Sequence, residues 1–111
     1  MKKTAYVIVM ITCSSGREAL KIKTALLEGE KAACVNIIPK VDSFFWWKAK
    51  IDSAHEVMLL AKTKSDRLKG IVTLVKKIHK YEVPEIIALP ITGGNNDYLK
   101  WISDSLSCKD K

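Results

Sequence analysis

The segment between residues 79 and 91 holds the side chains of this 111-residue chain that are best suited to chemistry. His79, one of only two histidines, is followed within six positions by a tyrosine, two glutamates and Pro84. An imidazole can bind a metal ion or transfer a proton near neutral pH, and a carboxylate beside it can assist in both. Two interpretations stay open: a binding site at the junction of two elements, or a charged connection with one surface histidine.

The elements on either side of this segment decide where His79 lies. Apolar residues before it recur at the spacing of one helix face, and Ser65 is placed to cap that helix. The helix must end before Val83, because Pro84 forces the preceding residue into an extended conformation. A strand from Glu85 to Ile91 follows. His79 therefore falls at the margin of the buried stripe, which consists of Leu68, Ile71, Val72, Val75 and Ile78.

The first part of the chain predicts a strand and a helix. Residues 4 to 13 form a continuous apolar run, which is typical of a strand buried on both faces. Ser15 and Glu18 then have the spacing of a capping box. The helix that follows has an inward stripe and a glycine suited to its C-terminal cap: Ala19, Ile22, Ala25 and Leu26, then Gly29.

A long hairpin is predicted in the middle of the chain. A strand begins at Ala33 and continues through the aromatic residues 44–47, and Pro39 within it indicates an edge position or a bulge. We place a turn at residues 51–53 and the returning strand at 56–62. Trp46 and Trp47 must point to opposite faces of the sheet. One is expected in the core, and the other in a subunit interface or stacked on a planar ligand.

The order of elements predicts a ferredoxin-like α+β fold, a βαββαβ sandwich with a long hairpin between its second and third strands. A short C-terminal helix begins near Asp97. The chain is expected to be one domain, residues 1–111, with its core in about 4–106 and a frayed tail at 107–111. Both connecting helices lie on one face of such a sheet, yet the strands are apolar at odd and even positions alike. An uncovered apolar face predicts an oligomer.

Composition narrows the cellular context. The net charge is +7, but the basic residues are scattered and predict a solvated surface more than a binding patch. Cys13, Cys34 and Cys108 are an odd number at wide spacing, which favours a reducing compartment over disulfides or a structural zinc site. The apolar run after Lys2 and Lys3 is short and β-branched, so we expect a strand there, not a signal peptide, and a cytoplasmic protein without a membrane partner.

Several segments combine into one pattern that covers roughly residues 5 to 106. They are Ala32-Ala33-Cys34 with Ile38-Pro39, Ser43 to Ile51, Glu56 with Lys62-Thr63, His79 to Ile86, and Leu89-Pro90-Ile91 with Gly94, Tyr98-Leu99 and Trp101. In this order and at this spacing they resemble the CutA divalent-ion tolerance proteins. Individually the segments are weak signals, whereas their combination is specific.

The resemblance implies a ferredoxin-like subunit in a tight homotrimer, held by strand pairing between long hairpins. It also implies tolerance to copper and other divalent cations, with copper or another divalent cation as ligand and no organic cofactor. A ligand-binding cleft between subunits is implied for residues matching Trp47, Glu56, Lys62, Tyr81, Glu85 and Tyr98, beside His79. An alternative is a trimer like the PII signalling proteins, or one that anchors another protein, without metal.

The metal candidates are His79 and Cys13. Neutral imidazole suits copper, although a histidine at the end of a helix can instead cap that helix. Copper-binding members carry a His-His pair, which reads Ile78-His79 here, and a cysteine whose match falls on Ile11; Cys13 lies two residues later on the same strand face. Cys34 is expected to be a small core residue. Cys108 is expected to be a free thiol of the tail, and His55 a surface residue.

Three rival functions compete with that of a binding protein, and nothing in the sequence excludes one of them, a purely structural scaffold. RNA-recognition domains share the ferredoxin-like topology but need exposed aromatic residues on their central strands, where this chain has aliphatic ones. No nucleic-acid partner is therefore expected. An enzyme would use His79 with Glu82 or Glu85 as an acid–base pair, but no nucleophile with a positioned base and no phosphate loop accompany them. We therefore expect a protein that binds and does not catalyse.

Overall fold

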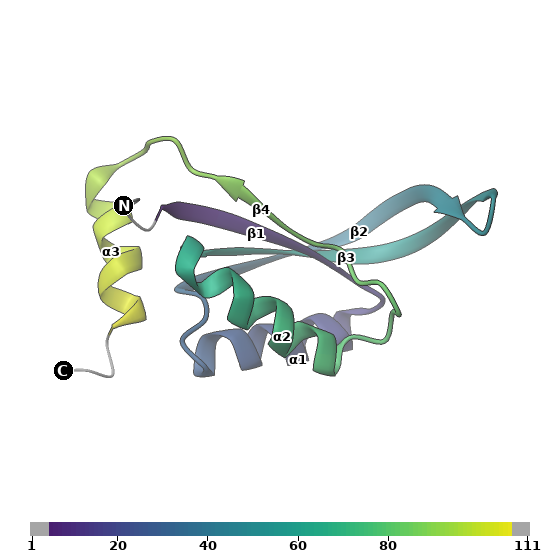
Figure 1. Ribbon diagram of the computed structural model, residues 1–111, viewed down its shortest axis with the longest axis horizontal. Helices are drawn as coiled ribbons and strands as arrows, with labels where there is room; N and C mark the ends of the chain where they lie inside the picture. Colours follow the sequence, from purple (N-terminus) through teal and green to yellow (C-terminus); the bar gives the residue numbers. More distant parts are fainter. Residues whose placement is uncertain (1–4, 108–111) are drawn as a thin grey trace.

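The computed structural model describes residues 5–107 as four strands and three α-helices (Figure 1). In chain order the elements are β1 (Tyr6–Cys13), α1 (Gly16–Glu28), β2 (Cys34–Trp47), β3 (Lys50–Lys64), a 3₁₀ turn (Ser65–Arg67), α2 (Leu68–Ile78), β4 (Ile86–Pro90) and α3 (Asn96–Leu106). The strands form one antiparallel sheet in the order β2-β3-β1-β4. This is the ferredoxin-like α+β fold that the order of elements predicts.

The core lies between the sheet and the two helices α1 and α2, which run along the same face of the sheet (Figure 1). Alternate residues of β1 and β3 point toward the helices, and the apolar stripes of α1 and α2 pack against them. The fully buried side chains include Val9, Ile11, Leu59, Ile22, Leu26, Ile71 and Val75. Each such aliphatic side chain contributes about 1.5–3 kcal/mol relative to leaving it exposed. The predicted stripes are confirmed at Ala19, Ile22 and Leu26 of α1 and at Ile71 and Val75 of α2, whereas Ala25, Leu68, Val72 and Ile78 are only half-buried.

The other face of the sheet is only partly covered within one chain. In the register of the sheet, Met10 lies between Leu60 on β3 and Ile87 on β4, and Ile8 pairs with Leu89. Ile87 and Leu89 remain 48% and 43% exposed. The helix α3 lies at one end of the sheet, where Ser103 Oγ is 2.7 Å from the Tyr6 hydroxyl. An apolar sheet face is thus left open, as the strand pattern predicts.

The hairpin of β2 and β3 extends beyond the helices and gives the chain a length of 47 Å (Figure 1). The expected irregularity at Pro39 is confirmed: β2 is an edge strand, and its register with β3 shifts between Ile38 and Val41. Lys40 takes up the extra length with a φ of 62°. Beyond this bulge, none of the helices within residues 5–107 covers the hairpin.

Our turn assignment at residues 51–53 is wrong. The chain turns at Lys48 and Ala49, and β3 begins at Lys50, six residues earlier than expected. The polar residues at 52, 53 and 55 resemble a turn because both faces of the hairpin are exposed here, so nothing requires them to be apolar. Lys48 and Ala49 have φ of 51° and 66°, the left-handed values that a two-residue hairpin turn needs at both positions.

Two further expectations need correction. Ser65 does not cap α2: it opens the 3₁₀ turn, and its hydroxyl accepts a hydrogen bond from the backbone N–H of Ala5 at 3.1 Å. Neither tryptophan is in the core, since Trp46 is 72% and Trp47 44% exposed. The alternation of their side chains is real, but this part of the hairpin has no subunit core on either side.

The turn offers a direct test of the hairpin geometry. Ala49→Gly removes a Cβ from a residue at φ 66°, so the free energy of unfolding should rise by about 0.5–1 kcal/mol. Ala54→Gly, in the middle of β3, should lower it by a similar amount, since glycine only weakens a regular strand. Urea unfolding at equal protein concentration measures both. Equal destabilisation by the two substitutions would contradict the turn assignment.

Candidate functional site

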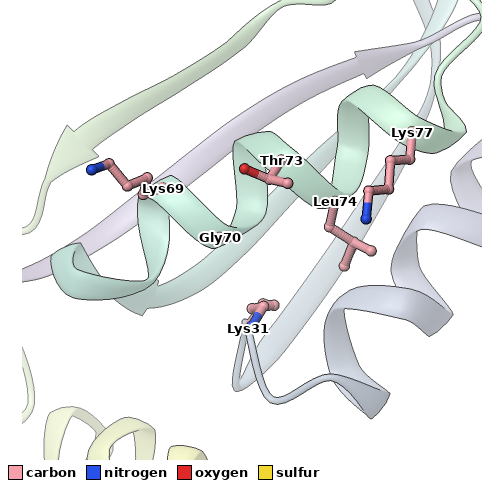
Figure 2. Close-up of a pocket in the computed structure, with 6 residues that line it drawn as sticks. All are labelled: Lys31, Lys69, Gly70, Thr73, Leu74 and Lys77. Atoms are coloured by element: carbon pink, nitrogen blue, oxygen red, sulfur yellow. The ribbon is translucent and has the colours of Figure 1, made fainter.

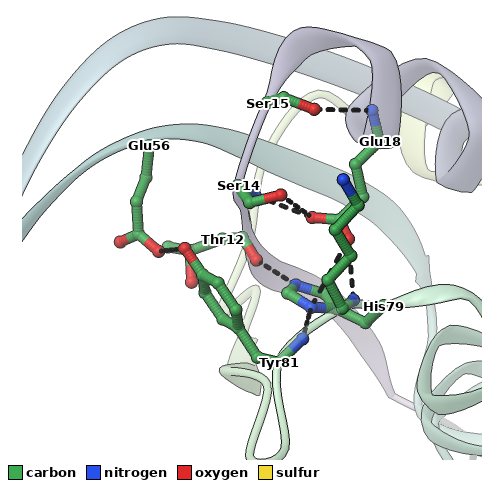
Figure 3. A network of polar contacts seen from close by, with 8 residues as sticks. Thr12, Ser14, Ser15, Glu18, Glu56, His79 and Tyr81 are labelled. Atoms are coloured by element: carbon green, nitrogen blue, oxygen red, sulfur yellow. Dashed lines mark hydrogen bonds and ion pairs between the residues drawn. The ribbon is translucent and has the colours of Figure 1, made fainter.

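The polar residues of the site meet where β1 runs into α1 and α2 runs toward β4 (Figure 3). Ser15 caps α1, and its hydroxyl accepts a hydrogen bond from the Glu18 N–H at 3.2 Å. The side chain of Glu18 does not close the predicted capping box on Ser15. It accepts instead from the N–H and hydroxyl of Ser14, at 2.7 and 3.0 Å, and from the Lys80 N–H at 2.8 Å. Glu18 therefore joins two connections that are 62 residues apart.

Glu18 carries a buried charge at this junction, with only 4% of its surface exposed. Burial alone would raise the pKa of its carboxyl. The hydrogen bonds from Ser14 and from the Lys80 backbone outweigh burial and lower the pKa below 4.5. The carboxylate is thus ionised at neutral pH.

His79 is buried directly after α2, and both of its ring nitrogens have partners. Its Nε2 lies 2.6 Å from the Thr12 carbonyl oxygen and donates to it. Its Nδ1 accepts a hydrogen bond from the Tyr81 N–H at 3.1 Å and lies 3.8 Å from Glu18 Oε2. These partners select the neutral tautomer with its proton on Nε2. His79 thus links the connection after α2 to the end of β1 through hydrogen bonds. This role differs from that of a charged histidine that caps the C-terminus of a helix.

Cys13 lies beside this pair at the end of β1. One ligand atom from each of Cys13, Glu18 and His79 lies within 4.8 Å of the other two. A thiolate, a carboxylate and an imidazole are a donor set that suits copper or zinc. The side chain of Cys13 is fully buried. Burial, with the charges of Glu18 and Glu56, raises the pKa of the Cys13 thiol to about 12.

A cleft of about 960 Å³ opens on the other side of Tyr81, between the hairpin and the connection before β4. The Tyr81 hydroxyl donates to Glu56 Oε2 at 2.8 Å (Figure 3), and burial with this contact raises the pKa of Tyr81 to about 12. The lining is aromatic and acidic, with Lys80 as the one cation among the described residues: Phe44, Phe45, Trp46, Trp47, Asp52, Glu56, Tyr81, Glu82 and Glu85 belong to it. Such a lining favours a cationic or aromatic ligand.

The structure brings four of the six predicted cleft residues to this place: Trp47, Glu56, Tyr81 and Glu85. Lys62 and Tyr98 do not line it. Lys62 hydrogen-bonds Asn36 on β2. Tyr98 stacks on Trp101 with their ring centroids 5.5 Å apart, and burial with a hydrogen bond to Cys34 raises the pKa of Tyr98. These two lie toward the opposite end of the sheet within one subunit.

Two cysteines and the second histidine are the remaining residues that the sequence analysis singled out. Cys34 is half-buried and contacts Tyr98, so our assignment of it to the core is wrong. His55 is the surface residue expected, with Nδ1 2.7 Å from Asp42 Oδ1. Cys108 lies outside the described residues. Sequence reasoning missed Glu18 as a site residue: its helix-capping spacing was visible, but nothing local showed that its carboxylate would meet the connection after α2.

The fold and this junction define a ferredoxin-like protein with an acidic cleft and an open sheet face. The family model described as "CutA1 divalent ion tolerance protein" matches residues 7–105. The chain belongs to the CutA1 divalent ion tolerance family. The family resemblance of the sequence and its fold are thereby confirmed.

Three relatives indicate how broadly the likeness extends. A CutA homolog of Xenopus laevis is 43% identical over 94 residues, which are 85% of this chain and 62% of that protein. The divalent-cation tolerance protein CutA of Pectobacterium atrosepticum is 34% identical over 100 residues, 90% of this chain and 91% of that one. The solved structure of a divalent cation tolerance protein from Thermus thermophilus is 41% identical, with a TM-score of 0.86, covering 87% of this chain and 94% of that one.

The chain spans only about half to two thirds of the length of the curated animal and plant relatives. Within residues 5–107, no helix is both long and apolar enough to cross a bilayer.

The buried carboxylate gives a testable pH dependence. Glu18→Gln should lower the free energy of unfolding at pH 7 by about 1–3 kcal/mol, because it replaces a charged acceptor of three hydrogen bonds. The pKa of Glu18 is lowered on folding, so its contribution is present above 4.5 and is lost as pH falls through the folded value. The difference between Glu18→Gln and wild type should therefore shrink toward pH 3 in urea titrations.

The matched control is Glu28→Gln on the same helix, where the side chain is exposed. It should stay within about 0.5 kcal/mol of wild type at both pH values. A Glu18→Gln deficit that is as large at pH 3 as at pH 7 would contradict the role given to the ionised carboxylate.

Proposed function

We propose that this chain is a homotrimeric divalent-cation tolerance protein that binds copper or another divalent metal, or a small ligand, in clefts between its subunits. The observation that carries the proposal is the open apolar face of the sheet, which continues into the uncovered hairpin. Ile87 and Leu89 lie on that face, and Trp46, Phe44 and Ile51 are exposed on the hairpin. Burying them against further copies would recover about 1.5–3 kcal/mol for each large side chain.

The separation of the predicted cleft residues supports an assembly. Glu56 and Lys62 share one face of β3 but are six residues apart, which is about 20 Å along a strand. Tyr98 lies with Lys62, whereas Trp47 and Tyr81 lie with Glu56. The residues near Lys62 and those near Glu56 in one subunit are therefore too far apart to contact the same small ligand. A threefold assembly of the family's type would place Lys62 and Tyr98 of one subunit at the acidic cleft of the next.

In this chain a metal would be held beside the cleft, inside each subunit, by the buried group Cys13, Glu18 and His79, which leaves the cleft itself to a small ligand. Their donor chemistry fits a borderline divalent cation, which would supply a fixed positive charge between the thiolate and the carboxylate. Binding must displace the proton of Cys13, whose thiol pKa is about 12, and the hydrogen bond that Nδ1 of His79 accepts from Tyr81. We expect uptake to strengthen as pH rises.

The alternative, a ligand-binding or protein-anchoring trimer without metal, is favoured by one observation. The imidazole of His79 and the carboxylate of Glu18 already have partners, whereas the cleft beside Tyr81 is open. In this alternative the buried group holds the loop in place, and the cleft takes a small cation or aromatic ligand.

The assembly can be tested on the open face. Ile87→Glu with Leu89→Glu places two charges on that face, so size-exclusion chromatography with light scattering should show the trimer dissociating to monomers. Leu20→Glu is the control, since Leu20 is 54% exposed on the outer side of α1 and should leave the mass unchanged. A wild-type protein that is monomeric at micromolar concentration would contradict the proposal.

Metal uptake can be tested by native mass spectrometry of metal-stripped protein with stoichiometric Cu(II). We expect up to three ions per trimer, lost in Cys13→Ser and His79→Ala and retained in His55→Ala, whose histidine is exposed. Cys13→Ser keeps the size of the buried side chain and guards against simple misfolding. A trimer that takes up no copper would leave the alternative as the function, and copper retained in both variants would contradict the assignment of Cys13 and His79 as ligands.

A further inference from the structure

A second pocket lies on the helical side of the molecule, away from the acidic cleft. It has a volume of about 390 Å³ and is bordered by α2 and by Lys31, which lies in the connection between α1 and β2 (Figure 2). Lys69, Thr73 and Lys77 recur every fourth residue along α2 and so share one face of the helix. We call this pocket, lined by Lys31, Lys69, Gly70, Thr73, Leu74 and Lys77, the lysine groove.

The charge of the lysine groove is uncompensated. None of the described residues that line it is acidic, and α2 carries no Asp or Glu at all. Within residues 5–107, the ammonium groups of Lys31, Lys69 and Lys77 make no ion pair and no hydrogen bond. The like charges of the lysine groove repel each other, and a bound anion would attract each of them and offset this repulsion.

The shape of the groove depends on Gly70 and Leu74. A Cβ added at Gly70 would come within 3.1 Å of Lys31 Cε and 3.4 Å of its Nζ, so the missing side chain allows the stem of Lys31 to lie against α2. Lys77 and Leu74 lie side by side on the same stretch of α2, facing the position of Lys31 (Figure 2). Thr73 adds a hydroxyl that can donate a hydrogen bond. The groove thus offers the cations of Lys31 and Lys77, with the Lys69 ammonium directed away from them at one end (Figure 2), one neutral donor and an apolar floor.

We propose that the lysine groove binds a multiply charged oligophosphate as a free compound. Lysine ammonium groups act as mobile point charges that suit several phosphate oxygens at once. The volume is in the range of small-molecule pockets. Among the described residues no aromatic side chain lines the groove to stack on a base, which argues against single-stranded nucleic acid as the occupant. The groove also lies opposite the open sheet face, so subunit assembly on that face leaves it accessible.

The test is isothermal titration of the full chain with sodium tripolyphosphate at low salt. The triple variant Lys31→Gln, Lys69→Gln, Lys77→Gln should lose more than about tenfold in affinity, because each charged contact is of the order of one decade. The control variant Lys21→Gln, Lys40→Gln, Lys76→Gln also removes three charges, from exposed positions outside the groove. It should stay within about threefold of wild type, the residual effect of net charge.

Gly70→Ala separates binding from folding. Alanine favours a helix over glycine, so thermal stability should not fall, while the new Cβ shifts the flexible stem of Lys31 by a few tenths of an ångström and should weaken binding less than the triple variant does. Equal losses in the triple variant and its control would overturn the proposal, since that result means attraction by net charge alone. No binding of tripolyphosphate would overturn it as well, as would tighter, groove-dependent binding of a single-stranded RNA.

Discussion

A single buried carboxylate organises the functional end of this fold. Glu18 is 4% exposed and accepts three hydrogen bonds, two from Ser14 before α1 and one from Lys80 after α2. An ionised group at this depth would cost several kcal/mol if its partners were lost. The two connections are therefore held together, because neither can move away without leaving a charge unpaired.

The hydrogen bonds of Glu18 position both candidate sites. Once the chain after α2 is fixed, the ring of His79 reaches Thr12 at the end of β1, and Tyr81 reaches Glu56 on the hairpin. The group formed by Cys13, Glu18 and His79 then lies on one side of Tyr81, and the acidic cleft lies on the other. A change at the buried group would be felt at the cleft through Tyr81, which gives metal or ligand binding a physical route to the subunit surface.

Periodicity predicts most of the fold correctly, because burial on one side of each element leaves a repeating pattern. The stripe from Leu68 to Ile78 and the uninterrupted run in β1 identify α2 and the central strand. The pattern fails where burial fails: the outer hairpin has no core on either side, so its polar residues at 52 and 53 imitate a turn and its tryptophans suggest a core that is not there. His79, Tyr81 and Glu85 of the site can be recognised from the sequence because they are close together in the chain. Glu18 cannot, because it joins them through a tertiary contact with Lys80, 62 residues away.

The proposed function depends on assembly of three copies through the open sheet face, because the proposed cleft is incomplete without a second and a third copy. Sedimentation equilibrium of the wild-type protein at micromolar concentration tests it most directly. The account predicts one species with three times the subunit mass of 12.4 kDa, unchanged on dilution. A species of 12.4 kDa would contradict it and would mean that Ile87, Leu89 and the hairpin tryptophans remain in contact with water.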